Sequence, residues 1–265
     1  MLSWTRRGRA MLLGPFAMVV AIVFLAPLVT VVLAGLAGSW TGPLPSTLGF
    51  SRVGDALSGE NLASLSVSLQ TAVVAGGLAL LLGTWAALAS RAAPRLLGRI
   101  VDAAFHLPIA VPSVALGLGL LIAFNSEPLL LGGTRWIVIL AHAVLVLAFA
   151  FSAVSAALDR LDPAFGQAAE SLGAGPFRVL TRVTLPLLLP ALGAAAGLAV
   201  ALSMGELGAT VMVYPATWKT LPVTIFALSD RGQALQAAAS TTVLLLVTLA
   251  ALTAVGRIRS AAAVR

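Results

Sequence analysis

The chain alternates long apolar stretches with short polar segments. A transmembrane helix needs about 20 mainly apolar residues, and six stretches reach that length, at about residues 11–36, 65–90, 105–124, 136–158, 187–211 and 235–256. Within each stretch the apolar residues are continuous and do not alternate with polar ones, which favours helices over the strands of a membrane barrel. The pattern predicts an all-α, polytopic membrane bundle with six transmembrane helices.

Composition narrows the class further. The 265 residues are 60% hydrophobic and 9% charged, whereas soluble domains carry about 25% charged residues. A soluble globular protein is therefore excluded, and so is a disordered chain, which would need low hydrophobicity. The chain has no cysteine, which excludes disulfide frameworks and zinc–cysteine sites. We expect a single multi-pass membrane domain over residues 1–265.

The positions of the basic residues predict the orientation of the spans. If the N-terminus lies in the cytoplasm, twelve of the sixteen arginines and lysines fall in cytoplasmic segments, as the positive-inside rule requires. Six spans then place the C-terminus in the cytoplasm too. Because the basic residues form no continuous patch, we expect membrane lipid and no nucleic acid as a partner. Trp136 and Trp218 are expected to anchor helix ends at the membrane surface.

One polar segment, residues 159–186, is long for a connection between two spans. Asp162 and Pro163 are typical of a helix start, and Gly173 is placed to end that helix in a left-handed conformation. Pro176 can open a second short helix. Four apolar residues of the first helix have helical spacing and predict one apolar stripe: Phe165, Ala168, Ala169 and Leu172. Such an amphipathic helix can pack under its own bundle, lie on the membrane surface or dock into a partner.

The same segment resembles the cytoplasmic EAA loop of ABC importer permeases. The resemblance rests on the type and spacing of seven residues: Gln167, Ala168, Ala169, Gly173, Val183, Leu185 and Pro186. It implies a MetI-like permease fold in a bacterial inner (plasma) membrane, with this loop forming a coupling helix that docks onto an ATP-binding subunit. It also implies two copies of that subunit, a second permease subunit (a sister chain or a second copy of this one) and an external substrate-binding protein.

The resemblance has one departure. Gln167 takes the place of the family's leading glutamate. Glu170, one turn later, could supply charge to the ATP-binding subunit instead; the alternative is a solvated carboxylate without that role.

Three further segments are similar to a narrower group of these permeases: residues 106–120, 203–210 and 220–232. They resemble permeases for sulfate, molybdate, ferric iron, thiamine and 2-aminoethylphosphonate, and residues 220–232 look most like the last of these. The resemblance implies import of a small solute, with 2-aminoethylphosphonate as the expected substrate and the other four as alternatives.

Motifs for catalysis are absent from the sequence. Without a GxxxxGK[ST] loop the chain cannot cradle ATP phosphates by that motif, so we expect no cofactor of its own and ATP bound by the partner subunit. No GxSxG or HExxH motif occurs, and His106 and His142 stand in different spans, so we expect neither an enzyme nor a metal site. An ion-coupled secondary transporter is the main alternative, and a structural membrane scaffold is the third.

Glu206 is an ionisable residue inside a predicted span. It follows Leu187 by 19 residues, about 28 Å along a helix, and so is expected near the outer end of the fifth span. Because an acid within a span is usually functional, Glu206 is a candidate pathway or gate residue. The alternative is an interfacial carboxylate that pairs with a basic side chain: Arg135, Lys219 or Arg231.

Two prolines interrupt the third predicted span. Pro108 and Pro112 remove two helical donors, so we expect a kink there. The freed carbonyl groups would need protein or water as partners. A helix beside a solute pathway would meet that need, and so would an ordinary bent helix.

Overall fold

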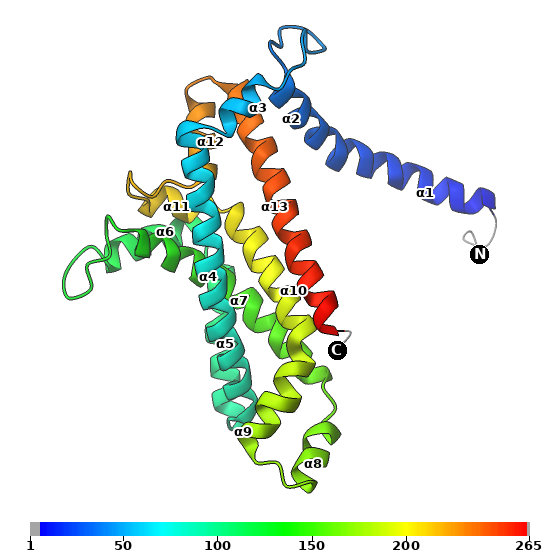
Figure 1. The fold of residues 1–265 in the computed structure, drawn as a ribbon, viewed down its shortest axis with the longest axis vertical. Coiled ribbons are helices and arrows are strands. Elements are labelled where there is room, and N and C mark those ends of the chain that lie inside the picture. The colour runs from blue at the N-terminus through cyan, green and yellow to red at the C-terminus, as the bar shows by residue number, and fades with distance from the viewer. Residues whose placement is uncertain (1–5, 264–265) are drawn as a thin grey trace. The chain divides into compact units, whose positions relative to one another are not determined.

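The computed structural model describes residues 6–263, and within that range the chain is helical without strands (Figure 1). The contacts divide it into two compact units. Unit 1 comprises the residues up to Leu62 together with Thr224–Leu245, and unit 2 comprises Ala63–Val223 together with the residues from Leu246 onward. The single-domain organisation and the orientation of the termini stay predictions.

Unit 1 contains the first predicted span and an irregular loop. Its elements are α1 (Arg6–Val20), η1 (Ala21–Leu25), α2 (Ala26–Leu36), α3 (Ser51–Ala56), most of α12 (Leu221–Asp230) and the first part of α13 (Ala234–Ala263). Arg52 orders the loop after α2, because its Nε donates to the Ala37 carbonyl at 2.9 Å and its Nη2 to the Gly38 carbonyl at 2.8 Å. Close packing of α2 on α13 requires Gly35, since a Cβ there would lie 2.9 Å from the Cα of Ala239.

Unit 2 is built around one long, buried helix, α7 (Arg135–Arg160). The elements before it are α4 (Gly59–Ala92), α5 (Arg95–Ala110) and α6 (Ser113–Ala123); those after it are α8 (Ala164–Ser171), α9 (Pro176–Val179), η2 (Leu180–Thr184), α10 (Leu185–Met204) and α11 (Gly208–Val213). Phe151 and Leu188 are fully buried in the core between α7 and α10. Gly83 lets α4 approach α7, because a Cβ there would lie 2.9 Å from the backbone nitrogen of Phe151. Such close helix contacts drive packing in lipid.

Five helices are long and apolar enough to cross a membrane, and one bent pair makes a sixth candidate span. This agrees with the six spans predicted from the sequence. The bent pair is α5 with α6, which meet at 107° around Val111 and Pro112. The third span is therefore a broken helix rather than a kinked one, and it begins ten residues earlier than predicted, at Arg95. The break lies at Pro112, which cannot donate to the helical ladder and keeps the preceding residue extended.

Two helices widen by one π-turn shortly before a proline. The segments η1 and η2 each end two residues before a proline, Pro27 and Pro186 respectively. In each case the residue just before the proline bonds five residues back, as with Leu185 N–H and the Leu180 carbonyl. A proline ring within a regular α-helix clashes with the carbonyl four residues earlier. The wider turn accommodates the proline, so both helices continue through it.

Candidate functional site

The short helix α8 begins and ends as its sequence predicts. Asp162 accepts a hydrogen bond from the backbone N–H of Ala164 at 2.9 Å, which satisfies one free donor of the first turn. Gly173 ends the helix with a φ of +83°. In that conformation the N–H of Gly173 donates to the Glu170 carbonyl at 2.9 Å and the N–H of Ala174 donates to the Ala169 carbonyl at 3.0 Å. The turn after α8 is thus a hydrogen-bonded unit that depends on a left-handed residue.

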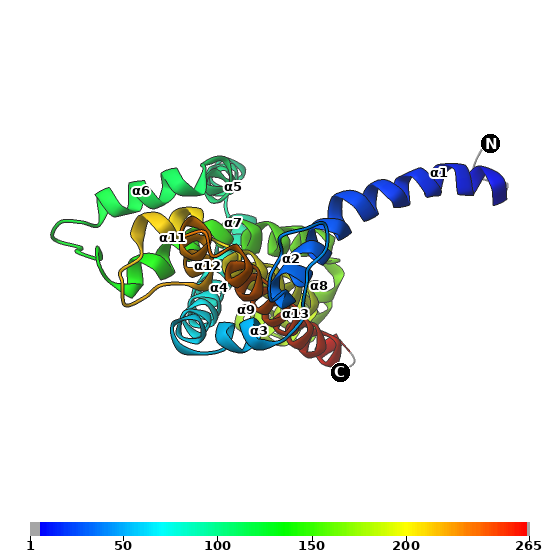
Figure 2. The ribbon, with the colours of Figure 1, turned by 90° about the horizontal axis from the view of Figure 1, so that it is seen from above.

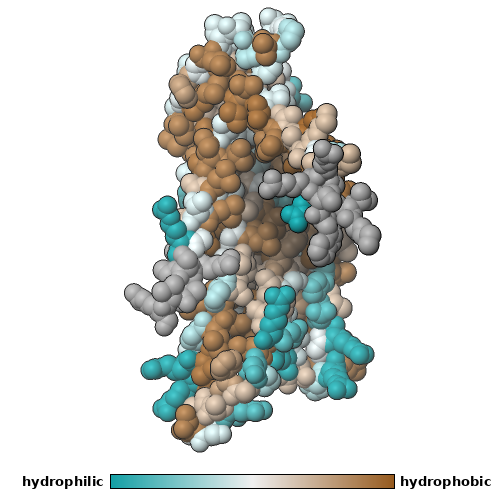
Figure 3. Space-filling view, turned by 90° about the vertical axis from the view of Figure 1, so that its right-hand side faces the viewer, coloured by the Kyte–Doolittle hydropathy of each residue, from teal (hydrophilic) through white to brown (hydrophobic). Residues whose placement is uncertain are grey.

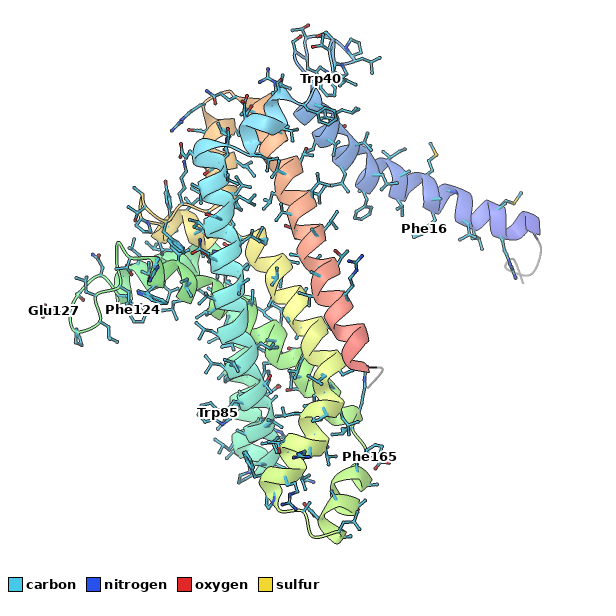
Figure 4. The ribbon with its side chains drawn as sticks, in the orientation of Figure 1. Phe16, Trp40, Trp85, Phe124, Glu127 and Phe165 are labelled. Atoms are coloured by element: carbon cyan, nitrogen blue, oxygen red, sulfur yellow. The ribbon has the colours of Figure 1, made fainter. Side chains whose placement is uncertain are left out.

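The two faces of α8 differ in what they meet. Gly166 and Ala169 are half-buried against the chain itself, and a Cβ on Gly166 would lie 3.8 Å from the side chain of Val179. Phe165 and Leu172 point outward and are 54% and 89% exposed, and Figure 4 shows Phe165 projecting from α8 on the side away from α9. The predicted apolar stripe is therefore split: Ala169 packs inward, while its other members are exposed.

The surroundings of α8 are mixed, since Phe177 on the neighbouring α9 is also 78% exposed. In the space-filling view, hydrophilic side chains gather towards the end where α8 and α9 lie (Figure 3). Gln167 and Glu170 are among the exposed residues of α8. An exposed phenylalanine and leucine on a short, polar helix form a surface suited to a partner protein.

The structure corrects the second half of the predicted loop. The chain is helical without interruption from Pro176 to Met204, so α9 is the start of the fifth long helix and not a separate short one. Val183, Leu185 and Pro186 consequently lie inside that helix. The widened turn at η2 is what allows Pro186 to be there. The loop itself is confined to residues 161–175.

A second place of interest lies where two helix breaks meet. One is the break between α5 and α6; the other, at Gly205–Leu207, separates α10 from α11. The short helices beyond the breaks, α6 and α11, pack side by side (Figures 1 and 2). Gly117 permits this contact, because a Cβ there would lie 2.7 Å from the carbonyl oxygen of Ala209. Gly208 likewise faces Ser113 without room for a side chain.

We expect Gly117→Ala to lower the stability of unit 2. The added methyl group would force α6 away from α11, and overpacking of this kind costs about 1–3 kcal/mol. Gly119→Ala is the matched control on the same helix, since nothing lies within 4 Å of a Cβ there. Thermal unfolding in detergent should show a lower midpoint for Gly117→Ala and an unchanged or slightly higher one for Gly119→Ala. Equal midpoints would show that α6 and α11 do not touch at Gly117.

His142 connects the elements around the second break. It is 1% exposed on α7, and its ring nitrogens reach two hydroxyls: Nδ1 lies 2.7 Å from Ser203 Oγ and Nε2 lies 2.8 Å from Thr210 Oγ1. A neutral imidazole suits both partners, since it donates to one hydroxyl and accepts from the other. The Thr210 hydroxyl also donates to the Glu206 carbonyl at 3.5 Å. One side chain thus fixes both α10 and α11 to α7.

Sequence reasoning did not identify this network. The sequence shows only that His142 stands in a different span from His106, and its hydroxyl partners stand 61 and 68 residues away along the chain. The signal in the sequence is weak: isolated polar residues within apolar runs. Within residues 6–263, no three histidine, aspartate or glutamate side chains converge to hold a metal ion.

Beside this network lies a cavity of about 180 Å³. Its walls come from the α5–α6 break (Val111, Ser113), from α7 (His142, Phe149) and from the end of α10 and the residues that follow (Ser203, Glu206). Since one water molecule needs only about 10–15 Å³ by this kind of measure, the cavity has room for several groups of that size. Residues from both helix breaks therefore line this one cavity.

Glu206 does not lie on the fifth helix, which is a correction of its predicted position. That helix ends at Met204, and Glu206 stands in the break, half-buried at the cavity. Its Oε1 accepts a hydrogen bond from the N–H of Ala209 at 2.6 Å. Sequence reasoning treated 187–211 as one continuous helix, whereas Gly205 ends it seven residues sooner.

Arg135, one of the three basic residues that the sequence offers as a partner for Glu206, has aromatic neighbours. The guanidinium of Arg135 lies 5.0 Å from the ring centre of Trp136 and 5.6 Å from that of Trp218, distances typical of cation–π contacts. Trp218 also donates from Nε1 to the Thr71 hydroxyl at 3.0 Å. Trp136 is half-exposed, as an anchor at the membrane surface would be.

Comparison with known proteins gives the family. Residues 79–261 match the family model described as "Binding-protein-dependent transport system inner membrane component". The chain is 46% identical over 250 residues to the "Putative 2-aminoethylphosphonate transport system permease protein PhnV" of Salmonella paratyphi A, covering 94% of each chain. It is 33% identical over 145 residues to the molybdenum transport system permease protein ModB of Escherichia coli, covering 49% of this chain and 62% of ModB.

A solved structure shares the fold. A permease chain in the crystal structure of the bacterial alginate ABC transporter, in complex with an alginate-bound periplasmic protein, aligns with a TM-score of 0.74 over 97% of both chains at 17% identity. The six candidate spans and the family match over most of the chain both indicate a multi-pass membrane protein. The chain belongs to the family of inner membrane components of binding-protein-dependent transport systems, and is a multi-pass permease of that family.

Proposed function

We propose that this permease is driven by a separate ATP-binding subunit that docks onto α8. The observation that carries the proposal is the helix itself: its outer face presents Phe165 and Leu172, and a left-handed turn at Gly173 holds it in place. ATP binding and hydrolysis then belong to the partner, and this chain is a non-catalytic subunit without a cofactor of its own. Coupling residues are those of α8 and its turn: Gln167, Ala168, Ala169, Glu170 and Gly173.

The path of the mechanical signal follows from the continuous helix after α8. From Pro176 to Met204 the helix has 29 residues, about 43 Å at 1.5 Å per residue. It begins three residues after the Gly173 turn and ends at the break that carries Glu206. A tilt imposed on α8 would therefore reach the cavity through one short turn and one continuous helix. In this proposal the first turns of the helix are stabilised by Val183, Leu185 and Pro186.

The proposed substrate is 2-aminoethylphosphonate, which an external binding protein would deliver. Support comes from the relatives named PhnV, which match nearly the whole chain at 46% identity; the molybdenum relative covers only half of it. A complete transporter would hold two ATP-binding subunits and a second permease subunit, either a sister chain or another copy of this one. Closure of the two ATP-binding subunits would rock the permeases outward while the binding protein releases its solute.

Uptake into proteoliposomes tests this proposal. We expect vesicles with the permease pair, its ATP-binding subunits and its binding protein to accumulate 2-aminoethylphosphonate only when ATP is enclosed with the ATP-binding subunits. An ionophore that collapses ion gradients should leave the rate unchanged. Uptake that continues without the ATP-binding subunit and stops with the ionophore would instead show a secondary transporter.

A further inference from the structure

The cavity at the two helix breaks has one formal charge. Among the side chains that line it, Glu206 is the only carboxylate, and lysine and arginine are absent. Apart from the imidazole of His142, the remaining walls are apolar or carry hydroxyls, such as Phe149 and Ser113. A space of this kind, mostly apolar with a few convergent polar groups, is typical of a small-molecule site. Its charge favours the cationic end of a solute.

We propose that this cavity is a transit site for the transported solute, in which the Glu206 carboxylate binds the ammonium group of an aminoalkylphosphonate. The inference rests on the proposed function, because it names the group through which this permease recognises that substrate. It assigns selectivity to the membrane subunit in addition to the binding protein.

The geometry leaves Glu206 free to do this. An ionised carboxylate has about four acceptor positions, and the Ala209 N–H occupies one of them, on Oε1. That bond fixes the side chain at the edge of the break, where the backbone of residues 205–207 is not helical. The carboxylate is therefore held in place and still able to accept hydrogen bonds from an ammonium group. Charge-assisted hydrogen bonds of this type are about twice as strong as neutral ones.

The neighbouring residues keep the site rigid. Ser203 and Thr210, on either side of Glu206, are both bonded to His142, so the break cannot unwind without losing those bonds. Non-helical backbone at membrane depth is tolerated where it lines a cavity, and in many transporters solute sites form at such discontinuous helices. The break at Glu206 and the break at Val111 line the same cavity, so both helix breaks contribute to the proposed site.

If Glu206 had a purely structural role, a substitution that keeps its hydrogen bond would leave solute binding and transport unchanged. Glu206→Gln keeps a side-chain oxygen that can accept from the Ala209 N–H, so the local structure should survive while the charge is lost. Glu127→Gln is the matched control, because Glu127 is exposed in the loop between α6 and α7, away from the cavity (Figure 4).

The experiment uses the complete transporter in lipid nanodiscs, without the binding protein, and radiolabelled 2-aminoethylphosphonate. We expect unlabelled 2-aminoethylphosphonate to displace the label from the wild type and from Glu127→Gln, and ethylphosphonate, which lacks the ammonium group, to displace it poorly. Glu206→Gln should bind the label at least about tenfold more weakly, and its remaining binding should no longer distinguish the two compounds. Uptake at saturating binding protein should fall in parallel.

Two results would overturn the inference, and they are distinguishable. If the wild type transports 2-aminoethylphosphonate and Glu206→Gln binds and transports it equally well, Glu206 only caps α11 and the proposed function stands. If the wild-type transporter does not take up 2-aminoethylphosphonate at all, the proposed substrate is wrong and the ammonium site falls with it.

Discussion

Gly173→Val is expected to abolish ATP-coupled uptake while the permease still inserts and expresses. The backbone at Gly173 has a φ of +83°, and an L-residue in that region costs about 1–2 kcal/mol, with more for a β-branched side chain. The variant can avoid the cost only by changing φ, which breaks the hydrogen bonds from Gly173 and Ala174 to the last turn of α8. The helix would then tilt away from the geometry that its partner requires.

Two further variants separate conformation from side-chain bulk. Gly175 lies two residues on with φ near −72°, and nothing lies within 4 Å of a Cβ there, so Gly175→Val adds the same side chain without strain. Gly173→Asn adds a side chain that tolerates the left-handed region. We expect Gly175→Val to transport normally and Gly173→Asn to transport partially. Uptake and ATPase rates in proteoliposomes, with co-purification of the ATP-binding subunit, measure the effect; normal coupled uptake by Gly173→Val would contradict the assignment of α8.

The helix α8 could be predicted from the sequence because the features that define its two ends are local. Asp162 bonds two residues ahead, and the turn at Gly173 closes within five residues. The spans could be located for a similar reason, since a run of apolar residues identifies a membrane helix without knowledge of its neighbours. What the loop packs against was beyond such reasoning. The half-buried face of α8 depends on the elements packed against it, such as α9 at Gly166, which a stripe on one helix does not reveal.

The cavity depends on contacts between distant residues, and so it could not be predicted. Prolines in the third span indicated a kink, but the 107° bend also needs α11 as a partner for α6. At Glu206 the apolar run simply continues past Gly205, and a length estimate along an unbroken helix misplaced the carboxylate. A glycine within an apolar run is common in membrane helices, so the sequence alone did not distinguish a packed glycine such as Gly83 from one at a helix end.

His142→Ala is expected to destabilise unit 2 strongly. Truncation of a fully buried side chain leaves a void, which costs about 2–5 kcal/mol for large aliphatic residues. It also leaves the Ser203 and Thr210 hydroxyls without their partner, and side-chain hydrogen bonds between membrane helices are worth about 0.6 kcal/mol each on average. We expect a loss of about 3–4 kcal/mol in the free energy of unfolding, measured by titration with sodium dodecyl sulfate in mixed micelles.

The second histidine of the chain is a close control for this prediction. His106 also reaches a serine hydroxyl, since its Nε2 lies 2.7 Å from Ser152 Oγ, but its side chain is 41% exposed. His106→Ala removes this bond and the contact of Nδ1 with the Asp102 carbonyl at 2.8 Å, but it leaves no sealed void, so a loss of no more than about 1 kcal/mol is expected. Comparable losses for the two variants would mean that His142 is not enclosed by α7, α10 and α11. In that case the break at Glu206 would lack its support, and a rigid carboxylate at the cavity could not be maintained.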